Sequence, residues 1–223
     1  MNQLIVVSTL KEIQPFLNSF NVSQKSSTSG FIKLSDELEL LISGIGSPST
    51  IFTLTKLLSA RQYGRIVQVG IAGSYKHDIP LGSIVEVGQD CFADLGIDDN
   101  GSFVQLFNTG LSSANEKPFK NGLLVNPGQK NTGFPNVRSI TVNTASGSNE
   151  LIQQRKSYFN PDIESMEGAA AFFVCMQMGI PIMQMRSISN MVEPRNKKAW
   201  EMDIAIKNLN NWLMDFVNVG ESN

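Results

Sequence analysis

Short apolar runs alternate along this chain with longer stretches in which apolar residues recur every three or four positions. A short apolar run bounded by polar or turn residues predicts a buried strand, whereas the longer period predicts a helix with one face in the core. The predicted strands cover residues 4–8, 39–43, 65–71, 81–87, 139–143 and 182–188, and the predicted helices residues 11–20, 48–58, 149–158, 165–178 and 203–219. Strands that alternate with helices form a largely parallel sheet covered by helices. The pattern therefore predicts an α/β fold.

The middle of the chain, residues 89–135, departs from this pattern. It is rich in Gly, Asn and Pro and has weak periodicity, which predicts loops and short strands at the surface around a site. The sequence contains no internal repeat, low-complexity segment or linker. With 223 residues, one domain can bury most of the surface that the unfolded chain exposes. We therefore expect residues 1–223 to form a single domain.

Composition argues against several kinds of function. The net charge of −2 and the lack of a Lys/Arg cluster argue against a nucleic-acid partner. No apolar stretch approaches the ~20 residues that span a bilayer, and the first residues predict a strand rather than a signal peptide, so we expect a cytoplasmic protein with no membrane partner. His77 is the only histidine, and Cys91 and Cys175 lie in unrelated contexts. These residues favour reduced thiols over a metal site, and we expect neither a metal nor a cofactor.

Glycine-rich segments follow several of the predicted strands. Gly44-Ile45-Gly46, Gly70-Ile71-Ala72-Gly73 and Thr144-Ala145-Ser146-Gly147 each lie at a carboxyl end of a strand, where α/β sheets bind their ligands. None completes the GxGxxG dinucleotide fingerprint, and each alone is typical of a tight turn. Their shared location predicts a small-molecule site without naming the molecule.

Five segments carry a more specific signal when they are taken together. They are Ser43-Gly44-Ile45-Gly46, then Gly70-Ile71-Ala72-Gly73 with Leu81-Gly82-Ser83-Ile84-Val85, then Thr144-Ala145-Ser146-Gly147, Ser165-Met166-Glu167-Gly168-Ala169-Ala170 and Arg186-Ser187-Ile188-Ser189-Asn190. In this order and spacing they resemble the nucleoside phosphorylase and nucleosidase superfamily over nearly the whole chain. The resemblance implies a three-layer phosphorylase/hydrolase-like fold, with a central mixed, partly barrel-like sheet flanked by helices.

Ala93-Asp94-Leu95-Gly96 and the segment 186–196 look most like the futalosine hydrolase branch, whose members remove hypoxanthine from futalosine on a route to menaquinone. The resemblance implies an N-glycosyl hydrolase that uses water on a purine nucleoside. It also implies a homodimer or higher homo-oligomer, because a neighbouring subunit's loop often completes the pocket in this superfamily. The alternatives are a methylthioadenosine/S-adenosylhomocysteine nucleosidase, a purine nucleoside phosphorylase and a non-catalytic nucleoside-binding protein.

The resemblance assigns Glu167 to the ribose 2′- and 3′-hydroxyls and packs Met166 against the sugar. A carboxylate suits that place, because the sugar becomes oxocarbenium-like as the bond to the base breaks. Glu12 matches, more loosely, the glutamate that deprotonates the attacking water, and Arg186 matches an arginine that points at this nucleophile. Each residue also has a purely structural alternative. Glu167 could be favoured by the dipole of its helix, and Met166 could be a core residue. Glu12 could be solvated on a helix surface, and Arg186 could belong to a buried ion pair.

Two positions favour water over phosphate as the nucleophile. Phosphorylases of this superfamily commonly carry an arginine and a hydroxyl where this chain has Gln68 and Ile71. A phosphate dianion requires charge-assisted donors, and neither side chain supplies charge or a hydroxyl.

Asn190 stands where methylthioadenosine nucleosidases carry an aspartate that protonates adenine N7. An amide cannot be a general acid, but its NH2 can donate to N7 and to a 6-oxo group, which favours a 6-oxopurine. The alternative is an asparagine that caps a turn at the end of a strand.

The remaining expectations concern the walls of the pocket. The resemblance places Ile71, Ala72, Gly73, Ser146 and Gly147 against the substrate, with the 144–147 segment offering backbone groups to the purine. Further candidates are Arg195, Lys197 and Lys198 for a carboxylate on the 5′ substituent, Phe92, Phe107 and Phe134 for an apolar slot, and Asp94 for the pocket or a subunit contact. Solvated charges are the alternative for the three cations, and His77 is expected in a surface turn.

Overall fold

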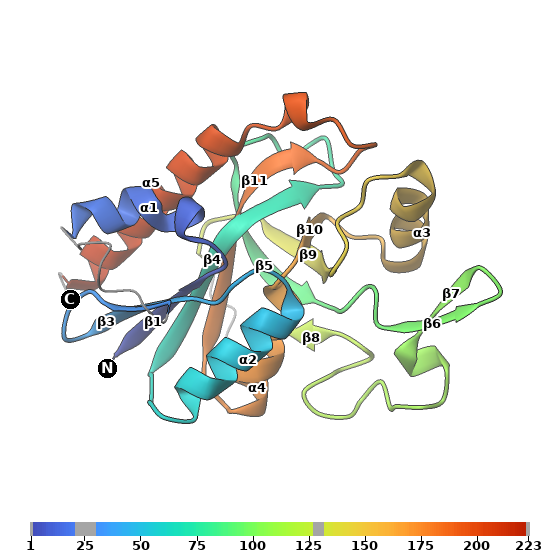
Figure 1. Cartoon of the computed structure of the whole chain (residues 1–223), viewed down its shortest axis with the longest axis horizontal. Helices are drawn as coiled ribbons and strands as arrows, with labels where there is room; N and C mark the ends of the chain where they lie inside the picture. The colour runs from blue at the N-terminus through green and yellow to red at the C-terminus, as the bar shows by residue number, and fades with distance from the viewer. Residues whose placement is uncertain (1, 21–29, 127–131, 222–223) are drawn as a thin grey trace.

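The computed structural model describes residues 2–20, 30–126 and 132–221 (Figure 1). Its main sheet has the strand order β10-β9-β5-β11-β4-β1-β3-β2, with β8 on β5. These strands are β1 (Gln3–Val7), β2 (Phe31–Lys33), β3 (Leu38–Ile42), β4 (Arg65–Ser74), β5 (Ile84–Asp90), β8 (Leu124–Val125), β9 (Asn136–Thr141), β10 (Ile163–Ser165) and β11 (Ile182–Met191). A separate hairpin consists of β6 (Gly96–Asp99) and β7 (Ser102–Gln105).

The sheet closes on itself at one end. β10 pairs in parallel with β9 and antiparallel with the far end of β4, so β4, β11, β5, β9 and β10 form a closed ring. The ring mixes both strand directions, because β5 runs antiparallel to β11 whereas β11 runs parallel to β4. The mixed, partly barrel-like sheet expected from the sequence is therefore confirmed.

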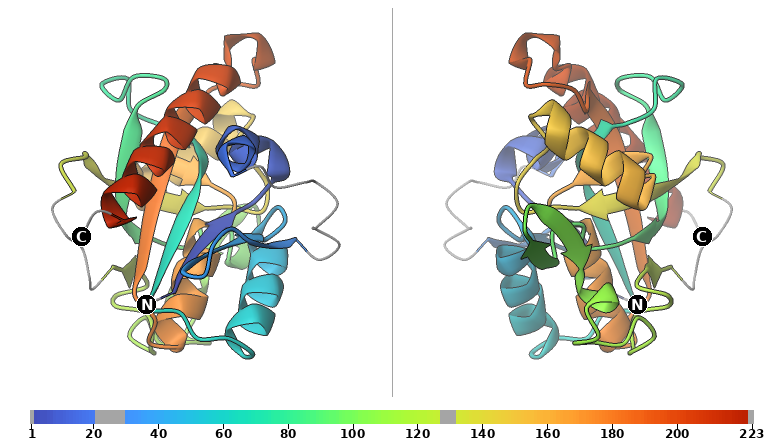
Figure 2. Two further views of the ribbon diagram at one scale, coloured as in Figure 1. Left: turned by 90° about the vertical axis from the view of Figure 1, so that its left-hand side faces the viewer. Right: turned by 90° about the vertical axis from the view of Figure 1, so that its right-hand side faces the viewer.

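Helices cover both faces of the sheet and complete three layers (Figures 1 and 2). α1 (Leu10–Ser19) and α5 (Met202–Glu221) lie on one face, and α2 (Ser47–Leu58) and α4 (Gly168–Gln177) lie on the other. Side chains alternate along β1, so that Leu4 and Val6 pack in the core with α2 and α4 while Ile5 and Val7 pack in the core with α1 and α5. Both faces of the strand are thus buried, as its uninterrupted apolar run predicts.

Helix α3 (Asn149–Phe159) lies beside the barrel-like end of the sheet (Figure 2). Ser148 caps it as predicted, since its Oγ accepts a hydrogen bond from Leu151 N–H at 3.3 Å. Two short 3-10 helices follow elsewhere, at Leu106–Asn108 and Lys197–Ala199. His77 is exposed in a turn after β4, as predicted.

Several predicted element boundaries are wrong. β9 begins at Asn136 rather than at 139, and β4 and β11 extend beyond 71 and 188 to Ser74 and Met191. The helix expected from residue 165 begins at Gly168, because Ile163–Ser165 form strand β10 and Glu167 is the N-cap. Such a short strand leaves no period in the sequence, and its existence depends on pairing with the distant β4 and β9. The strand expected over 81–87 is β5 at Ile84–Asp90, because Gly82 takes a left-handed turn conformation with φ of +80° before it.

Within the described residues, no helix combines the length and hydropathy needed to cross a membrane. The same part of the chain holds no cluster of three His, Cys, Asp or Glu side chains that could bind a metal ion.

Candidate active site

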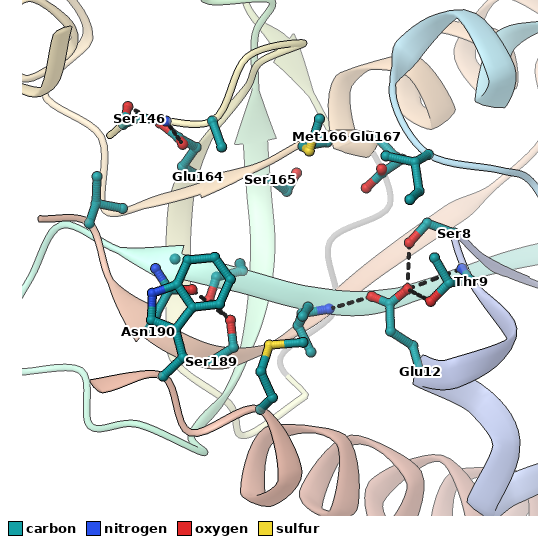
Figure 3. Close-up of a pocket in the computed structure, with 18 of the residues that line it drawn as sticks. Ser8, Thr9, Glu12, Ser146, Glu164, Ser165, Met166, Glu167, Ser189 and Asn190 are labelled. Carbon is teal, nitrogen blue, oxygen red and sulfur yellow. Dashed lines mark hydrogen bonds between the residues drawn. The ribbon is translucent and has the colours of Figure 1, made fainter. Parts of the chain in front are cut away.

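A cavity of about 390 Å³ opens where β1, β4, β10 and β11 end (Figure 3). Its volume lies within the range typical of small-molecule sites. The structure brings together eight of the predicted site residues as lining: Glu12, Ile71, Ala72, Gly73, Ser146, Met166, Glu167 and Asn190. We call the region of Ser8, Thr9, Glu12 and Glu167 the carboxylate end, and the region of Ser146, Glu164, Ser189 and Asn190 the amide end, since Figure 3 shows them on opposite sides.

Glu12 lies in the first turn of α1, directly after β1, and only 6% of it is exposed. Its Oε2 accepts hydrogen bonds from Ser8 Oγ (2.5 Å), Thr9 Oγ1 (2.6 Å) and Thr9 N–H (3.1 Å). Its Oε1 accepts one from Ile71 N–H of β4 at 3.2 Å. Four donors thus fix this carboxylate at the pocket, so Glu12 is not the solvated surface residue that the sequence left as an alternative.

Glu167 is buried between β10 and α4. Its Oε1 accepts a hydrogen bond from Gly46 N–H at 2.9 Å, the one donor that the described residues give this carboxylate with good geometry. Burial raises the pKa of Glu167, the Arg186 guanidinium and the Gly46 N–H oppose this, and the Glu12 carboxylate adds to it. Glu167 therefore keeps acceptor capacity for a ligand in the pocket.

Arg186 lies beneath the pocket rather than in its wall. Its side chain is fully buried, and Nε donates to Gln184 Oε1 at 3.1 Å. Nη1 sits against Gly70, where any Cβ would overlap it and would come within 3.3 Å of Glu12 Oε1. Glycine at this position therefore lets the guanidinium approach Glu12 through the strand.

Arg186 forms no direct ion pair among the described residues, but its positive charge still acts on the nearby carboxylates. Burial lowers the pKa of Arg186, whereas the carboxylates of Glu167, Glu12 and Asp90 raise it. A buried cation is thus shared among three acidic side chains, two of which line the pocket.

Asn190, at the end of β11, has its amide orientation fixed by neighbours. Ser189 Oγ donates to Asn190 Oδ1 at 2.8 Å, and Asn190 Nδ2 donates to Met191 O at 2.9 Å. With its oxygen occupied by a donor, the amide retains its second N–H as the group that a ligand can use. The amide end therefore offers a hydrogen-bond donor.

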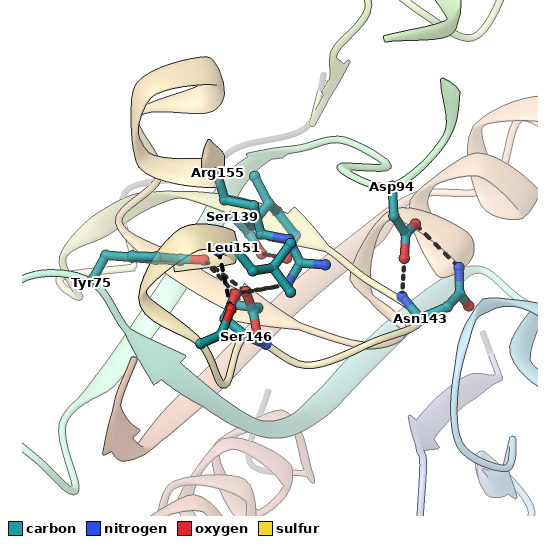
Figure 4. A network of polar contacts seen from close by, with 10 residues as sticks. Tyr75, Asp94, Ser139, Asn143, Ser146, Leu151 and Arg155 are labelled. Atoms are coloured by element: carbon teal, nitrogen blue, oxygen red, sulfur yellow. Dashed lines mark hydrogen bonds and ion pairs between the residues drawn. The ribbon is translucent and has the colours of Figure 1, made fainter. Parts of the chain in front are cut away.

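A buried network built on Glu164 holds the amide end together (Figures 3 and 4). The Glu164 carboxylate accepts hydrogen bonds from Ser146 N–H (2.8 Å), Ser146 Oγ (2.6 Å) and Tyr75 OH (2.7 Å), and it pairs with Arg155 Nη1 at 3.2 Å. Burial raises the pKa of the Tyr75 hydroxyl. Because the N–H and hydroxyl of Ser146 are both engaged, that residue offers a ligand its carbonyl rather than the N–H.

Like Arg186, the predicted residues Gly147 and Asp94 lie outside the pocket lining. Gly147 is at its rim, where its carbonyl accepts a hydrogen bond from Arg195 N–H at 3.3 Å. Asp94 instead holds Asn143 after β9, accepting hydrogen bonds from its N–H (2.5 Å) and from Nδ2 (3.2 Å), as Figure 4 shows. Asp94 therefore anchors the segment after β5 to the end of β9.

The three phenylalanines predicted as an apolar slot do not form one in this pocket. None of the three lines the pocket: Phe92 packs on Phe173, Phe107 on Phe119 and Phe134 on Trp212. Of the three predicted cations only Arg195 lines it, and Lys197 and Lys198 lie in a 3-10 helix nearby.

Sequence reasoning missed several lining residues, including Ser8, Thr9, Glu164 and Trp200. Ser8 and Thr9 follow the first strand, so the rule that sites form at carboxyl ends of strands could have found them. Trp200 is the single aromatic side chain among the lining residues, and the N–H of the next residue, Glu201, donates to Ser189 O at 2.8 Å. No local signal in the sequence marks Glu164.

This arrangement can support a defined kind of chemistry. A fixed carboxylate can take a proton from a small nucleophile, and a second carboxylate with open acceptor capacity can stabilise developing positive charge. An amide donor at the opposite end can stabilise negative charge on a leaving group.

Comparison with known proteins identifies relatives of this chain. The chain is 28% identical to the futalosine hydrolase of Streptomyces coelicolor over 180 residues, which cover 78% of this chain and 76% of that protein. It is 26% identical to a 5′-methylthioadenosine/S-adenosylhomocysteine nucleosidase of Buchnera aphidicola over 221 residues, covering 90% and 87% of the two chains.

Solved structures show the same fold. The futalosine hydrolase of Helicobacter pylori superposes with a TM-score of 0.79 at 18% identity, over 98% of this chain and 97% of that one. The MTA/SAH nucleosidase of Streptococcus pneumoniae in complex with 8-aminoadenine gives 0.77 at 17% identity, over 97% and 99%. A family model described as the phosphorylase superfamily matches residues 5–219. This chain therefore belongs to the phosphorylase superfamily.

Proposed function

We propose that this protein is a nucleosidase that hydrolyses the N-glycosidic bond of futalosine and releases hypoxanthine. The three futalosine hydrolases among its relatives, at 24–28% identity, support this assignment. In this proposal Glu12 activates water, and Glu167 and Met166 hold the sugar. Asn190 holds the departing base, whereas Arg186 acts on Glu12 and Glu167 from beneath the pocket.

The observation that carries the proposal is the hydrogen bond from Ile71 N–H to Glu12 Oε1. At this position of β4 the backbone donor that could meet an anionic nucleophile is already bound to a carboxylate. A phosphate dianion beside Glu12 would meet like charge, whereas a water molecule can give its proton to it. Gln68 does not offer a donor to the pocket, because it is buried beneath the cavity without lining it, and its Nε2 donates to Glu167 O at 3.3 Å. These contacts favour hydrolysis over phosphorolysis.

The amide end supports a 6-oxopurine as the base. Ser189 Oγ donates to Asn190 Oδ1 and Met191 O accepts one amide N–H, which leaves the second N–H for N7 or O6 of hypoxanthine. The Ser146 and Ala145 side of the pocket would form the other wall, and Ile71, Ala72 and Gly73 the floor. Arg195 is the pocket-lining cation we assign to the carboxylate of the 5′ substituent.

The test is a product analysis. The purified protein is incubated with futalosine, aminodeoxyfutalosine, inosine and methylthioadenosine, with and without phosphate, and the released base and sugar are identified. We expect hypoxanthine and a free sugar from futalosine, at a rate independent of phosphate. Base release that requires phosphate, or no release from futalosine, would contradict the proposal.

A methylthioadenosine/S-adenosylhomocysteine nucleosidase is the second candidate. The relative from Buchnera aphidicola covers more of this chain than the futalosine hydrolases do, which favours it. Preferential release of adenine from methylthioadenosine in the same assay would establish this alternative.

We further propose that the protein is one domain of residues 1–223 that acts in the cytoplasm, in a futalosine route to menaquinone.

We also propose that it acts as a homodimer. Ile45 lines the pocket although it is 60% exposed, and Phe52 on α2 is 67% exposed beside an apolar groove at Pro48 and Ile51. A second subunit at α2 would cover these side chains and the open side of the pocket. Light scattering should give twice the mass of one chain for the wild type, and the mass of one chain for the Phe52→Glu variant. A fully active monomer would contradict the dimer.

A further inference from the structure

A second cluster of polar side chains lies beneath the pocket, between the sheet and the start of α4. It consists of Gln68, Asp90, Gln184 and Arg186, none more than 2% exposed. Each has one buried atom without a hydrogen-bond partner among the described residues: Gln68 Oε1, Asp90 Oδ2, Gln184 Nε2 and Arg186 Nη2. Buried polar atoms are nearly always paired, so four unpaired ones in one place require an explanation.

Gln184 connects the members of this cluster. Its Oε1 accepts from Arg186 Nε at 3.1 Å, and Gln68 lies opposite it in the register of β4 and β11. Both Gln184 Oε1 and Asp90 Oδ2 press on Gly168, where a Cβ would overlap them. Asp90 and Gln184 therefore meet at the same side of Gly168, and Gln184 in turn binds Arg186, whose charge acts on the carboxylates of the pocket.

The two oxygens of Asp90 have different surroundings. Oδ1 accepts hydrogen bonds from Cys91 N–H (2.8 Å) and Thr141 Oγ1 (3.0 Å). Oδ2 receives none from the described residues and shares the space beside Gly168 with the acceptor oxygen of Gln184. Two acceptor oxygens in one buried place repel unless one carries a proton, and a neutral carboxyl group supplies that proton as an O–H donor.

The groups around Asp90 support a neutral carboxyl group. β9 presents the hydroxyls of Ser139 and Thr141, and α4 presents only the backbone at Gly168. The Ser165 hydroxyl of β10 lies beside the same position and accepts from Gly168 N–H, but Asp90 Oδ2 receives no hydrogen bond from it. Among the described residues, Arg186 on β11 is the one charged group that acts on Asp90. The neighbouring Cys91 thiol is the other titratable group. Burial raises the pKa of Asp90 to about 7, although the hydrogen bond from Thr141 and the charge of Arg186 lower it.

We propose that Asp90 is a positioning residue whose protonated carboxyl group holds Gln184, and through it the Arg186 guanidinium, against Glu12 and Glu167. This inference rests on the proposed function of those two carboxylates, and Asp90 itself does not line the pocket. When Asp90 loses its proton, a third anion competes for the charge of Arg186. The guanidinium is then drawn away from the carboxylate end, and turnover falls.

The experiment compares pH profiles of futalosine hydrolysis for the wild type, Asp90→Asn and Asp90→Ala. We expect the wild-type kcat to fall above about pH 7, the pKa that burial gives Asp90. Asp90→Asn should lack this decline, because its amide can donate to Gln184 Oε1 at every pH. Asp90→Ala should lower kcat by about tenfold or more while KM changes less than about threefold. The matched control is Asp98→Asn, which removes an exposed carboxylate of the β6–β7 hairpin and should reproduce the wild-type profile.

An alkaline decline retained in Asp90→Asn, or a wild-type kcat in Asp90→Ala, would overturn the inference. A second measurement does not require turnover: the carboxyl carbon of Asp90 is followed by 13C NMR, with Asp90→Asn to assign it. We expect a neutral Asp90 at about pH 6, and an ionised one there also overturns the inference. The NMR titration decides the protonation state of Asp90 even if futalosine is not a substrate. Failure of the proposed function can therefore be distinguished from failure of this inference.

Thermal unfolding gives a third readout with a defined sign. The folded pKa of about 7 lies above the ordinary value of 3.8, so the folded state binds the proton more tightly than the unfolded state. Stability from this group is therefore lost as pH rises from about 4 to about 7. The melting temperature of Asp90→Asn should rise relative to the wild type across that window and stay constant above it; a constant difference across the window contradicts the inference.

Discussion

The two ends of the pocket differ in charge. At the carboxylate end, Glu12 and Glu167 are each only 6% exposed and share the buried cation of Arg186. At the amide end, the charge of Glu164 is cancelled within the protein by Arg155 at 3.2 Å. What this end presents to a ligand is therefore the neutral amide of Asn190, with its orientation fixed by Ser189.

This difference separates rate from selectivity. Buried charges interact strongly with charge that develops in a transition state, because the surrounding dielectric is low. Neutral donors and acceptors distinguish bases by pattern, since a mismatched base leaves a buried polar group unpaired. We therefore expect changes at the carboxylate end to lower turnover for every substrate, and changes at the amide end to alter which base is released.

Glu12→Gln should give the largest effect. The amide keeps the shape of the side chain but cannot accept a proton from water, so kcat should fall by roughly 10²–10⁴-fold. Its NH2 must face at least one of the four donors, so the melting temperature should fall as well, while the variant still folds. Steady-state kinetics with futalosine measure the fall in kcat, and Glu150→Gln on the exposed start of α3 is the matched control. Near-normal turnover in Glu12→Gln would remove the carboxylate end from the chemistry.

Glu167→Gln should follow, with a loss of about 10²-fold in kcat. The variant keeps an acceptor but loses the charge that stabilises an oxocarbenium-like sugar. A 2′-deoxy substrate sharpens the test, because it lacks one hydroxyl that Glu167 is proposed to hold. The wild type should discriminate against it and the variant should not; equal discrimination in both proteins would contradict a contact with the sugar.

Asn190→Asp should shift selectivity by about tenfold towards adenine nucleosides, through the proton that an aspartic acid can give to N7. The measurement is the ratio of kcat/KM for inosine and adenosine. A proportional loss on both substrates would show that the amide end contributes to rate in the same way as the carboxylate end.

Ser189→Ala should have the smallest effect. It removes the 2.8 Å hydrogen bond to Asn190 Oδ1 and frees the amide to rotate, which costs about 1 kcal/mol, or roughly fivefold in the same ratio. Ser8→Ala is the control at the other end, because it removes one of four donors to Glu12 and should lower kcat/KM equally for both nucleosides.

Much of the carboxylate end and of the fold could be predicted from the sequence. The apolar periods located the strands that form both cores, and the Met166-Glu167-Gly168 motif located the buried glutamate. Glu12 was found although the local match is loose. These features were accessible because each depends on a short stretch of chain or on a motif that survives in order.

The support beneath and beside the pocket could not be predicted. Strand β10 has three residues and exists because β4 and β9 flank it, and it carries Glu164 to Tyr75, 89 positions earlier in the chain. Asp90 falls in the segment 89–135, which the sequence predicts as loops and short strands, and only the closed ring of strands brings it to Gly168. Contacts such as Glu164 with Tyr75 form only when the sheet closes, and the local sequence around these residues gives no signal for them.

Strand β4 has a consequence for recombining this chain with its relatives. One strand carries the Gly70 position that admits Arg186, the Ile71 N–H that binds Glu12 and the Gly73 position beside Asn190, while it pairs with β1, β10 and β11. An insertion or deletion of one residue within it would displace both ends of the pocket at once. Chimaeras should therefore take β4 and β11 from the same parent, and a single junction in the β6–β7 hairpin, which lies between these two strands in the chain, would separate them.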